Sequence, residues 1–260
     1  MSRTAPNELQ RELALAQRLA DAARPIALSY FRQPLTVERK PDLSPVTAAD
    51  RAIEIALRSM IREHFPAHGI IGEEFASEPG TEFTWVLDPI DGTKSFISGL
   101  PLFGTLIALL QDQQPVLGVI EIPAMAERWL GRDGSPTQLN GRATRASACA
   151  SIGQARIVTT SPNAFASEDW QRFDALSSRA AVRRFGGDCY AYGLLASGHC
   201  DLVIEAGLAP YDYLALVPVI EGAGGKISDW RGAALGLKSD GRVVAAANES
   251  LWHLALEGLA

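Results

Sequence analysis

The segment WVLDPIDGTKSF, residues 85–96, passes from apolar residues into two acids, a glycine and a threonine. Its apolar start predicts a buried strand that delivers Asp88 to an edge of a sheet. Burying an acid beside a core without a partner is costly, so Asp88 is difficult to explain as a purely structural residue. Gly92 and Thr93 precede a predicted short helix over residues 94–96, and backbone N–H groups at a helix start bind phosphate well.

Further acids stand where other predicted elements begin or end. Glu73 and Glu74 follow the run IIG, and Asp212 opens a predicted late helix. Hard cations such as magnesium prefer oxygen ligands, commonly one or two carboxylates with water and substrate oxygens. A cluster of Glu73, Asp88, Asp91 and Asp212 would hold two or three magnesium ions. Two ions roughly 4 Å apart can hold both the attacking and the leaving oxygen of an in-line displacement.

The residues around Thr93 could activate a nucleophile. The Thr93 hydroxyl could hold a water, and Asp50 could accept a proton from Thr93 or from that water. Asp50 also lies three residues after Thr47, which is the spacing of a capping box at the start of a helix. The two roles of Asp50 are geometrically compatible.

Several simpler explanations remain open for the individual acids. Asp91 and Gly92 could form only a turn, Asp212 could be only an N-cap, and Glu73 could belong to a solvated loop. An aspartyl-phosphate mechanism of the haloacid dehalogenase type is improbable, because its D-x-D-G-T pattern has one residue between the acids and D-P-I-D-G-T has two. The segment also lacks the ligand pattern of an EF-hand calcium loop.

Composition narrows the class of protein. The chain has 260 residues, 47% of them hydrophobic and 21% charged, which is enough for a substantial core. Its net charge of −6 disfavours a nucleic-acid partner, and its apolar runs are too short to span a bilayer, so no membrane association is expected. We expect a cytoplasmic protein without a signal peptide, in which three cysteines are reduced thiols: Cys149, Cys189 and Cys200. No P-loop is present, and four histidines are expected to be surface or structural: His64, His68, His199 and His253.

The periodicity of the remaining sequence predicts two halves of different character. The first half is predicted to contain helices at 7–32 and 47–65, a turn-rich linker KPDLSP at 40–45, and a hairpin of strands at 104–110 and 116–121. A Gly-, Ser-, Thr- and Ala-rich region at 131–153 is the predicted boundary. Strands and helices then alternate, which favours an α/β layer. Strands are predicted at 155–161, 182–185, 200–207 and 243–248, and helices at 166–180, 190–198, 212–223 and 249–259.

Together these residues resemble the inositol monophosphatase family of phosphatases. The resemblance rests on four blocks: SPVTAAD at 44–50, GEE at 72–74, WVLDPIDGTKSF at 85–96 and PYDYLALVPVIEGAGG at 210–225. It implies a layered αβαβα sandwich, usually a homodimer. An α+β half at 1–145 would carry most metal ligands, and an α/β half at 146–260 would carry the substrate-selecting residues and the last metal ligand.

The resemblance also implies residue roles in phosphate ester hydrolysis. The magnesium ligands would be Glu73, Asp88, the Ile90 carbonyl, Asp91 and Asp212. The catalytic residues would be Asp50, Thr93 and Glu73, with Asp50 and Thr93 orienting the attacking water, and the amides of Gly92 and Thr93 would bind phosphate. Metal-activated water would attack directly, without a phosphoenzyme. The family often has Trp before the last metal aspartate, where this sequence has Tyr211.

The substrate is the more difficult prediction. The stretch GGDCYAYGLLASG at 186–198 places Asp188 where inositol phosphatases have a small residue, and so resembles the histidinol-phosphate phosphatase branch. Asp188 and Glu205 would favour a cationic substrate, with Asp91 and Asp212 also touching it. Asp188 could instead cap the following helix. The alternatives to histidinol phosphate, an intermediate of histidine biosynthesis, are inositol 1-phosphate or a range of sugar phosphates. A non-catalytic regulatory protein is less probable.

Overall fold

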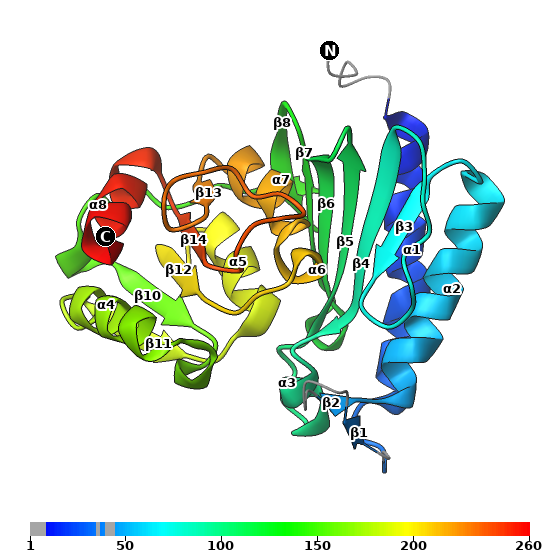
Figure 1. Cartoon of the computed structure of the whole chain (residues 1–260), viewed down its shortest axis with the longest axis horizontal. Helices are drawn as coiled ribbons and strands as arrows, with labels where there is room; N and C mark the ends of the chain where they lie inside the picture. The colour runs from blue at the N-terminus through cyan, green and yellow to red at the C-terminus, as the bar shows by residue number, and fades with distance from the viewer. Residues whose placement is uncertain (1–8, 35–36, 40–44) are drawn as a thin grey trace.

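The computed structural model describes residues 9–34, 37–39 and 45–260, which stack in five layers of helices and sheets (Figure 1). The two outer helical layers and the middle one enclose two sheets. The outer helices beside the larger sheet are α1 (Gln10–Tyr30) and α2 (Ala48–His64). The middle layer holds α5 (Asp188–Ala196), α6 (Pro210–Tyr213) and α7 (Leu216–Gly222), and the far layer holds α4 (Ser167–Ser177) and α8 (Glu249–Leu259). The predicted αβαβα sandwich is confirmed.

The larger sheet has seven strands in the order β3-β4-β5-β6-β7-β8-β9. Strand β3 is parallel to β4, and all later neighbours are antiparallel, which confirms the predicted β5–β6 hairpin. The strands are β3 (Gly69–Gly72), β4 (Phe83–Asp91), β5 (Gly104–Gln111), β6 (Gln114–Ile122), β7 (Glu127–Arg132), β8 (Ser135–Leu139) and β9 (Arg142–Ala143).

The smaller sheet has five strands in the order β11-β10-β12-β14-β13. Strand β10 is parallel to β11 and β12, as alternating strands and helices predict, whereas β14 is antiparallel to both of its neighbours. The strands are β10 (Arg156–Thr159), β11 (Val182–Phe185), β12 (Leu202–Glu205), β13 (Lys226–Ser228) and β14 (Val243–Ala246). Short 3₁₀ turns are η1 (Pro123–Met125), η2 (Ile152–Gln154) and η3 (Pro162–Ala164), and β1 (Glu38–Arg39) pairs with β2 (Pro45–Val46).

Helix α2 begins with the capping box that its sequence predicts. The Thr47 hydroxyl accepts a hydrogen bond from the Ala49 N–H at 3.1 Å, and Asp50 accepts one from the Thr47 N–H at 2.8 Å. These bonds satisfy backbone donors that a helix start leaves unpaired. They also fix the first turn of α2 beside β2, which packs against α3 (Thr93–Ile97).

Apolar side chains fill the spaces between the layers. The cluster between the two sheets joins Val86 of β4 to Val203 of β12 through Tyr213 and Leu216 of the middle helices. Each of these side chains is almost completely buried, and burial of one such side chain stabilises the fold by roughly 1.5–3 kcal/mol. The cluster therefore fixes α5 and α6 against the end of β4.

Some boundaries differ from the sequence-based expectations. Strand β4 does not end at Asp88 but continues to Asp91. The first part of the glycine-rich region at 131–153 forms β8 and β9 of the larger sheet. Strand β8 alternates in burial and pairs with β7. The helix predicted at 212–223 is two helices, α6 and α7. Residues 7–8 of the first predicted helix and residues 40–44, which include most of the linker KPDLSP, lie outside the described residues. Within the described part of the chain, no helix is long and apolar enough to cross a membrane.

Candidate active site

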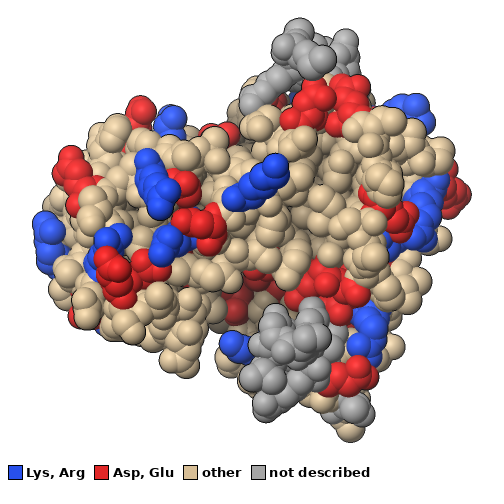
Figure 2. All heavy atoms as spheres, in the orientation of Figure 1, with Lys and Arg blue, Asp and Glu red and all other residues tan. Residues whose placement is uncertain are grey.

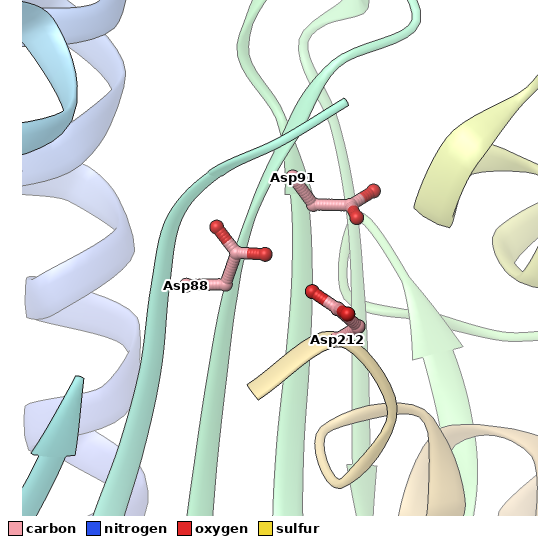
Figure 3. Close-up of side chains that lie close together, drawn as sticks. All are labelled: Asp88, Asp91 and Asp212. Atoms are coloured by element: carbon pink, nitrogen blue, oxygen red, sulfur yellow. The ribbon is translucent and has the colours of Figure 1, made fainter. Parts of the chain in front are cut away.

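Three aspartates converge at the end of β4 (Figure 3). Asp88 and Asp91 come from β4, and Asp212 comes from α6, more than a hundred residues later in the chain. One carboxylate oxygen of each aspartate lies within 4.8 Å of those of the other two. The structure thus brings together acids that the sequence singled out separately.

A bulge in β4 explains why two acids three residues apart serve one site. Alternate residues of a regular strand point to opposite faces, so Asp88 and Asp91 would diverge. Asp88 pairs with Leu106 of β5 and Asp91 with Gly104, so three steps along β4 match two along β5. The extra residue restores a common side. Pro89, which lacks a backbone N–H, stands inside this irregular stretch.

Two of the aspartates also organise helix starts. Asp212 accepts a hydrogen bond from the Ala209 N–H at 2.7 Å, so it satisfies a backbone donor at the start of α6 as well as entering the acidic cluster. Asp91 accepts a hydrogen bond from the Cys189 N–H at 2.6 Å, which ties the start of α5 to the end of β4. Asp212 is therefore not the N-cap of α6, which is Ala209, but the third residue of the helix, and its bond to the Ala209 N–H does not replace membership in the cluster.

The cluster is electrostatically unfavourable without a cation. Burial raises the pKa of Asp88 well above its usual range, and the neighbouring Glu73, Asp91 and Asp212 carboxylates raise it further. Burial also raises the pKa of Asp91 well above its usual range, with Asp188 and Asp212 as the next causes. The buried Oδ1 atom of Asp88 has no hydrogen-bond partner within the described ranges. Converging carboxylates with an unsatisfied oxygen fit a hard divalent cation.

The turn after Asp91 has a conformation that requires glycine. Gly92 adopts φ +78°, and a Cβ added there would come within 2.7 Å of Cγ of Asp188. The Phe96 N–H donates to the Gly92 carbonyl at 2.9 Å, which closes the first turn of α3, and the Thr93 hydroxyl donates to the Ile90 carbonyl at 3.1 Å. The predicted short helix after Gly92 is confirmed, and Gly92, Thr93 and Ser95 line a cavity at the end of β4.

Asp188 lies over this turn. It is the first residue of α5 and has φ +47°, a left-handed conformation that is uncommon for residues other than glycine. Its Oδ2 accepts a hydrogen bond from the Ser95 hydroxyl at 2.5 Å. Burial raises its pKa, while the bond from Ser95 and the charge of Lys94 oppose the rise. Asp188 is not the N-cap that could have explained it, because the N-cap of α5 is Gly187 and Asp188 is the first residue of the helix.

Glu205 supplies a further buried carboxylate at the end of β12. It accepts hydrogen bonds from the Thr160 N–H and hydroxyl, each at 2.8 Å, and from the Thr159 hydroxyl at 3.3 Å. Burial nevertheless raises its pKa from an ordinary 4.5 to about 7. A raised folded-state pKa means that the stability contributed by Glu205 is fully present below about pH 4.5 and is lost as the pH rises through 7.

We therefore expect Glu205→Gln to change the pH dependence of stability in the metal-free protein. Between pH 4.5 and 7 the wild type should lose about 1.4 kcal/mol per pH unit at this residue, about 3 kcal/mol in all, and the variant should not. Urea unfolding at pH 4, 6 and 8 measures the difference between the two proteins. Glu168→Gln, at an exposed position of α4, is the control. Parallel curves for wild type and Glu205→Gln would contradict the prediction.

The acids and the turn at Gly92 and Thr93 line one cavity of about 480 Å³ between the two sheets. In Figure 2, acidic atoms are visible inside a recess on this face. The cavity is lined by nine residues that the sequence analysis singled out: Glu73, Asp88, Ile90, Asp91, Gly92, Thr93, Asp188, Glu205 and Asp212. Asp50 is not in this lining; it is buried and bound to the Thr47 N–H and hydroxyl, so its catalytic role stays a prediction. None of the four histidines lines the cavity.

Ser95, Thr160 and Tyr192 also line the cavity, although the sequence alone predicts no role for them. Ser95 lies in the quoted segment, but only the fold shows that Asp188 packs above it. Thr160 lies within the strand predicted at 155–161, but in the structure it directly follows β10, which ends at Thr159. Tyr192 lies four residues after Asp188, a helical spacing that places both on one face.

Comparison with known proteins places this fold and site in a class of phosphatases. The model of the Inositol monophosphatase family matches residues 8–259. The chain belongs to this family and is a phosphatase, as its motifs predict.

Individual relatives cover most of the chain. The bifunctional phosphatase IMPL2, chloroplastic, of Arabidopsis thaliana is 46% identical over 268 residues, which cover 99% of this chain and 78% of that protein. A histidinol-phosphatase of Chlorobaculum parvum is 38% identical and covers 90% of this chain and 92% of its own length. Among solved structures, an inositol monophosphatase from Zymomonas mobilis has a TM-score of 0.90 and 46% identity, with 99% of each chain covered.

Proposed function

We propose that this protein hydrolyses L-histidinol phosphate to L-histidinol and phosphate, and that magnesium is its cofactor. The observation that carries the proposal is the position of two carboxylates outside the three-aspartate cluster. Asp188 lies over the phosphate-binding turn and Glu205 lines the same cavity. Carboxylates can accept hydrogen bonds from the hydroxyls of a neutral polyol, but a substrate with an ammonium group and an imidazole also supplies positive charge to balance two further acids.

The chain's own residues suit the chemistry of ester hydrolysis. Magnesium, held by Glu73, Asp88, Asp91, Asp212 and the Ile90 carbonyl, would neutralise phosphate charge and make water more acidic. The Gly92 and Thr93 amides would bind the phosphate oxygens. Thr93 and Asp50 would orient the water that attacks phosphorus on the side opposite the ester oxygen. The bond between phosphorus and that oxygen breaks, and the oxygen leaves as part of the alcohol.

The relatives support both the leading substrate and its rival. The histidinol-phosphatase of Chlorobaculum parvum supports L-histidinol phosphate. The Zymomonas mobilis structure is described as an inositol monophosphatase, which favours inositol 1-phosphate as the second candidate.

A panel of phosphate monoesters tests the proposal directly. With magnesium present, we expect kcat/KM for L-histidinol phosphate to exceed that for inositol 1-phosphate and glucose 6-phosphate by at least about a hundredfold, the value of one hydrogen-bonded charge pair. Removal of magnesium with a chelator should abolish phosphate release. A wild-type preference for inositol 1-phosphate would refute the substrate assignment, and absence of phosphate release from every ester would refute the enzymatic function.

A further inference from the structure

One buried hydroxyl in the cavity has no role in the proposed chemistry. Tyr192 is only 2% exposed, lines the cavity, and its hydroxyl oxygen has no hydrogen-bond partner among the residues that the structure describes. A buried polar atom without a partner is destabilising, and phenylalanine would fill the same volume without that cost. The wall of the cavity therefore includes a buried polar group that no described residue satisfies, and that a bound molecule or water would satisfy.

The position of Tyr192 relates it to the substrate-selecting acids. It lies one helical turn after Asp188, on the same face of α5. Burial raises the pKa of Tyr192 well above its usual range, and the charges of Glu205, Asp91 and Asp212 raise it further, so the phenol keeps its proton. Tyr192 thus holds its hydroxyl close to the acidic cavity as a donor.

Three other hydroxyls that line the cavity already donate to protein acceptors, unlike that of Tyr192. The Thr93 hydroxyl donates to the Ile90 carbonyl, that of Ser95 to Asp188, and that of Thr160 to Glu205. The carboxylates can accept hydrogen bonds from a cationic or N–H group of a ligand but cannot donate when ionised. Tyr192 adds an uncommitted donor, which matches an acceptor atom on the ligand.

We propose that Tyr192 is a specificity-determining residue whose hydroxyl donates a hydrogen bond to an acceptor atom in the alcohol part of the substrate. This inference rests on the proposed function. With L-histidinol phosphate, the acceptor is the unprotonated ring nitrogen of the imidazole, while Asp188 and Glu205 accept from the ammonium and the ring N–H. The ligand class is therefore an amino-alcohol phosphate whose side chain presents a hydrogen-bond acceptor.

A pair of tyrosine variants on one helix provides the test. Tyr192→Phe removes only the cavity hydroxyl. Tyr190→Phe makes the same change elsewhere on α5, where the hydroxyl is bonded to Glu127 and the ring packs on Trp129 at 5.8 Å. Kinetics are measured at saturating magnesium with L-histidinol phosphate, with L-phenylalaninol phosphate, which lacks the ring nitrogens, and with propyl phosphate.

For Tyr192→Phe we expect KM for L-histidinol phosphate to rise about tenfold, with kcat changed less than about twofold. KM for the other two esters should stay within about twofold, because neither offers the ring acceptor. The melting temperature of the metal-free variant should not fall, since the lost group is unsatisfied there. Tyr190→Phe should leave all kinetic constants unchanged.

Three outcomes would overturn the inference: unchanged kinetics of Tyr192→Phe on L-histidinol phosphate, an equal rise of KM on all three esters, or the same rise in Tyr190→Phe. The first would mean that water alone satisfies the hydroxyl. Failure of the proposed function is distinguishable, because it is seen in the wild type as a preference for inositol 1-phosphate. If the wild type prefers inositol 1-phosphate, Tyr192→Phe is measured on that ester and on propyl phosphate. A rise of KM for inositol 1-phosphate alone would support the contact of Tyr192 with the alcohol part of the substrate. Equal changes of KM for both esters would refute it.

Discussion

Asp88→Asn is expected to lower kcat/KM at saturating magnesium by at least about a thousandfold, and to make the metal-free protein more stable. The activity falls because Asp88 is a buried member of the three-aspartate cluster with one unsatisfied oxygen. Asparagine keeps the shape of the side chain but removes the negative charge that a divalent cation requires.

The stability of the metal-free protein should change in the opposite direction to activity. The raised pKa of Asp88, caused by burial and then by Glu73, means that its stability contribution is present below about pH 4 and lost as the pH rises through the folded-state pKa. At pH 8 the uncharged asparagine avoids this loss, so the metal-free variant should melt at a higher temperature than wild type. Addition of magnesium should raise the melting temperature of wild type much more than that of the variant.

Asp201→Asn is the matched control for Asp88→Asn. Asp201 is equally buried, but its carboxylate accepts hydrogen bonds from Arg156 and Ser147, and the Arg156 pairing helps to lower its pKa. Its replacement should therefore reduce stability and leave the magnesium-induced shift intact. Thermal unfolding with and without magnesium separates the two variants. If Asp88→Asn behaved like Asp201→Asn, the three-aspartate cluster would not be a cation site.

The acidic cluster could be predicted from the sequence mainly because of Asp88, since each of the other acids taken alone has an ordinary structural explanation. An acid that directly follows a strongly apolar run, such as Asp88, has few structural explanations, and the nearby Gly92 and Thr93 suit an anion. The convergence of Asp212 on Asp88 could be expected only from the family motifs, because nothing local to residue 212 specifies which strand it meets. The β4 bulge shows why strict alternation would have separated Asp88 from Asp91.

The residues that sequence reasoning missed depend on contacts between distant segments. Ser95 donates to Asp188, which lies 93 positions later in the chain. The two meet because the start of α5 packs over the turn at Gly92. Tyr192 could be aligned with Asp188 by helical spacing, but its lack of a partner is a property of the folded cavity. The boundary predicted at 131–153 contains more structure than its composition indicates, because the short strand β8 is stabilised by pairing with β7, and β9 by pairing with β8.

Asp188→Asn is expected to lower kcat/KM for L-histidinol phosphate by about a hundredfold and to change that for inositol 1-phosphate by less than about threefold. Asparagine tolerates the left-handed conformation at φ +47° and can still accept the hydrogen bond from Ser95. The substitution therefore removes the charge while the start of α5 keeps its position. Kinetics on both substrates at saturating magnesium measure the change in selectivity.

Ser95→Ala separates the charge of Asp188 from its position. It removes the hydroxyl that donates to Asp188 but keeps the carboxylate, so we expect a smaller loss of about fivefold on L-histidinol phosphate. An equal loss on both substrates in Asp188→Asn would show that Asp188 maintains the phosphate-binding turn, which it contacts at Gly92, and does not select the substrate. The alternative result is a loss that is confined to L-histidinol phosphate and is larger for Asp188→Asn than for Ser95→Ala. Both variants perturb the same contact, but only Asp188→Asn removes the negative charge. That result therefore requires that the charge itself recognises the cationic alcohol.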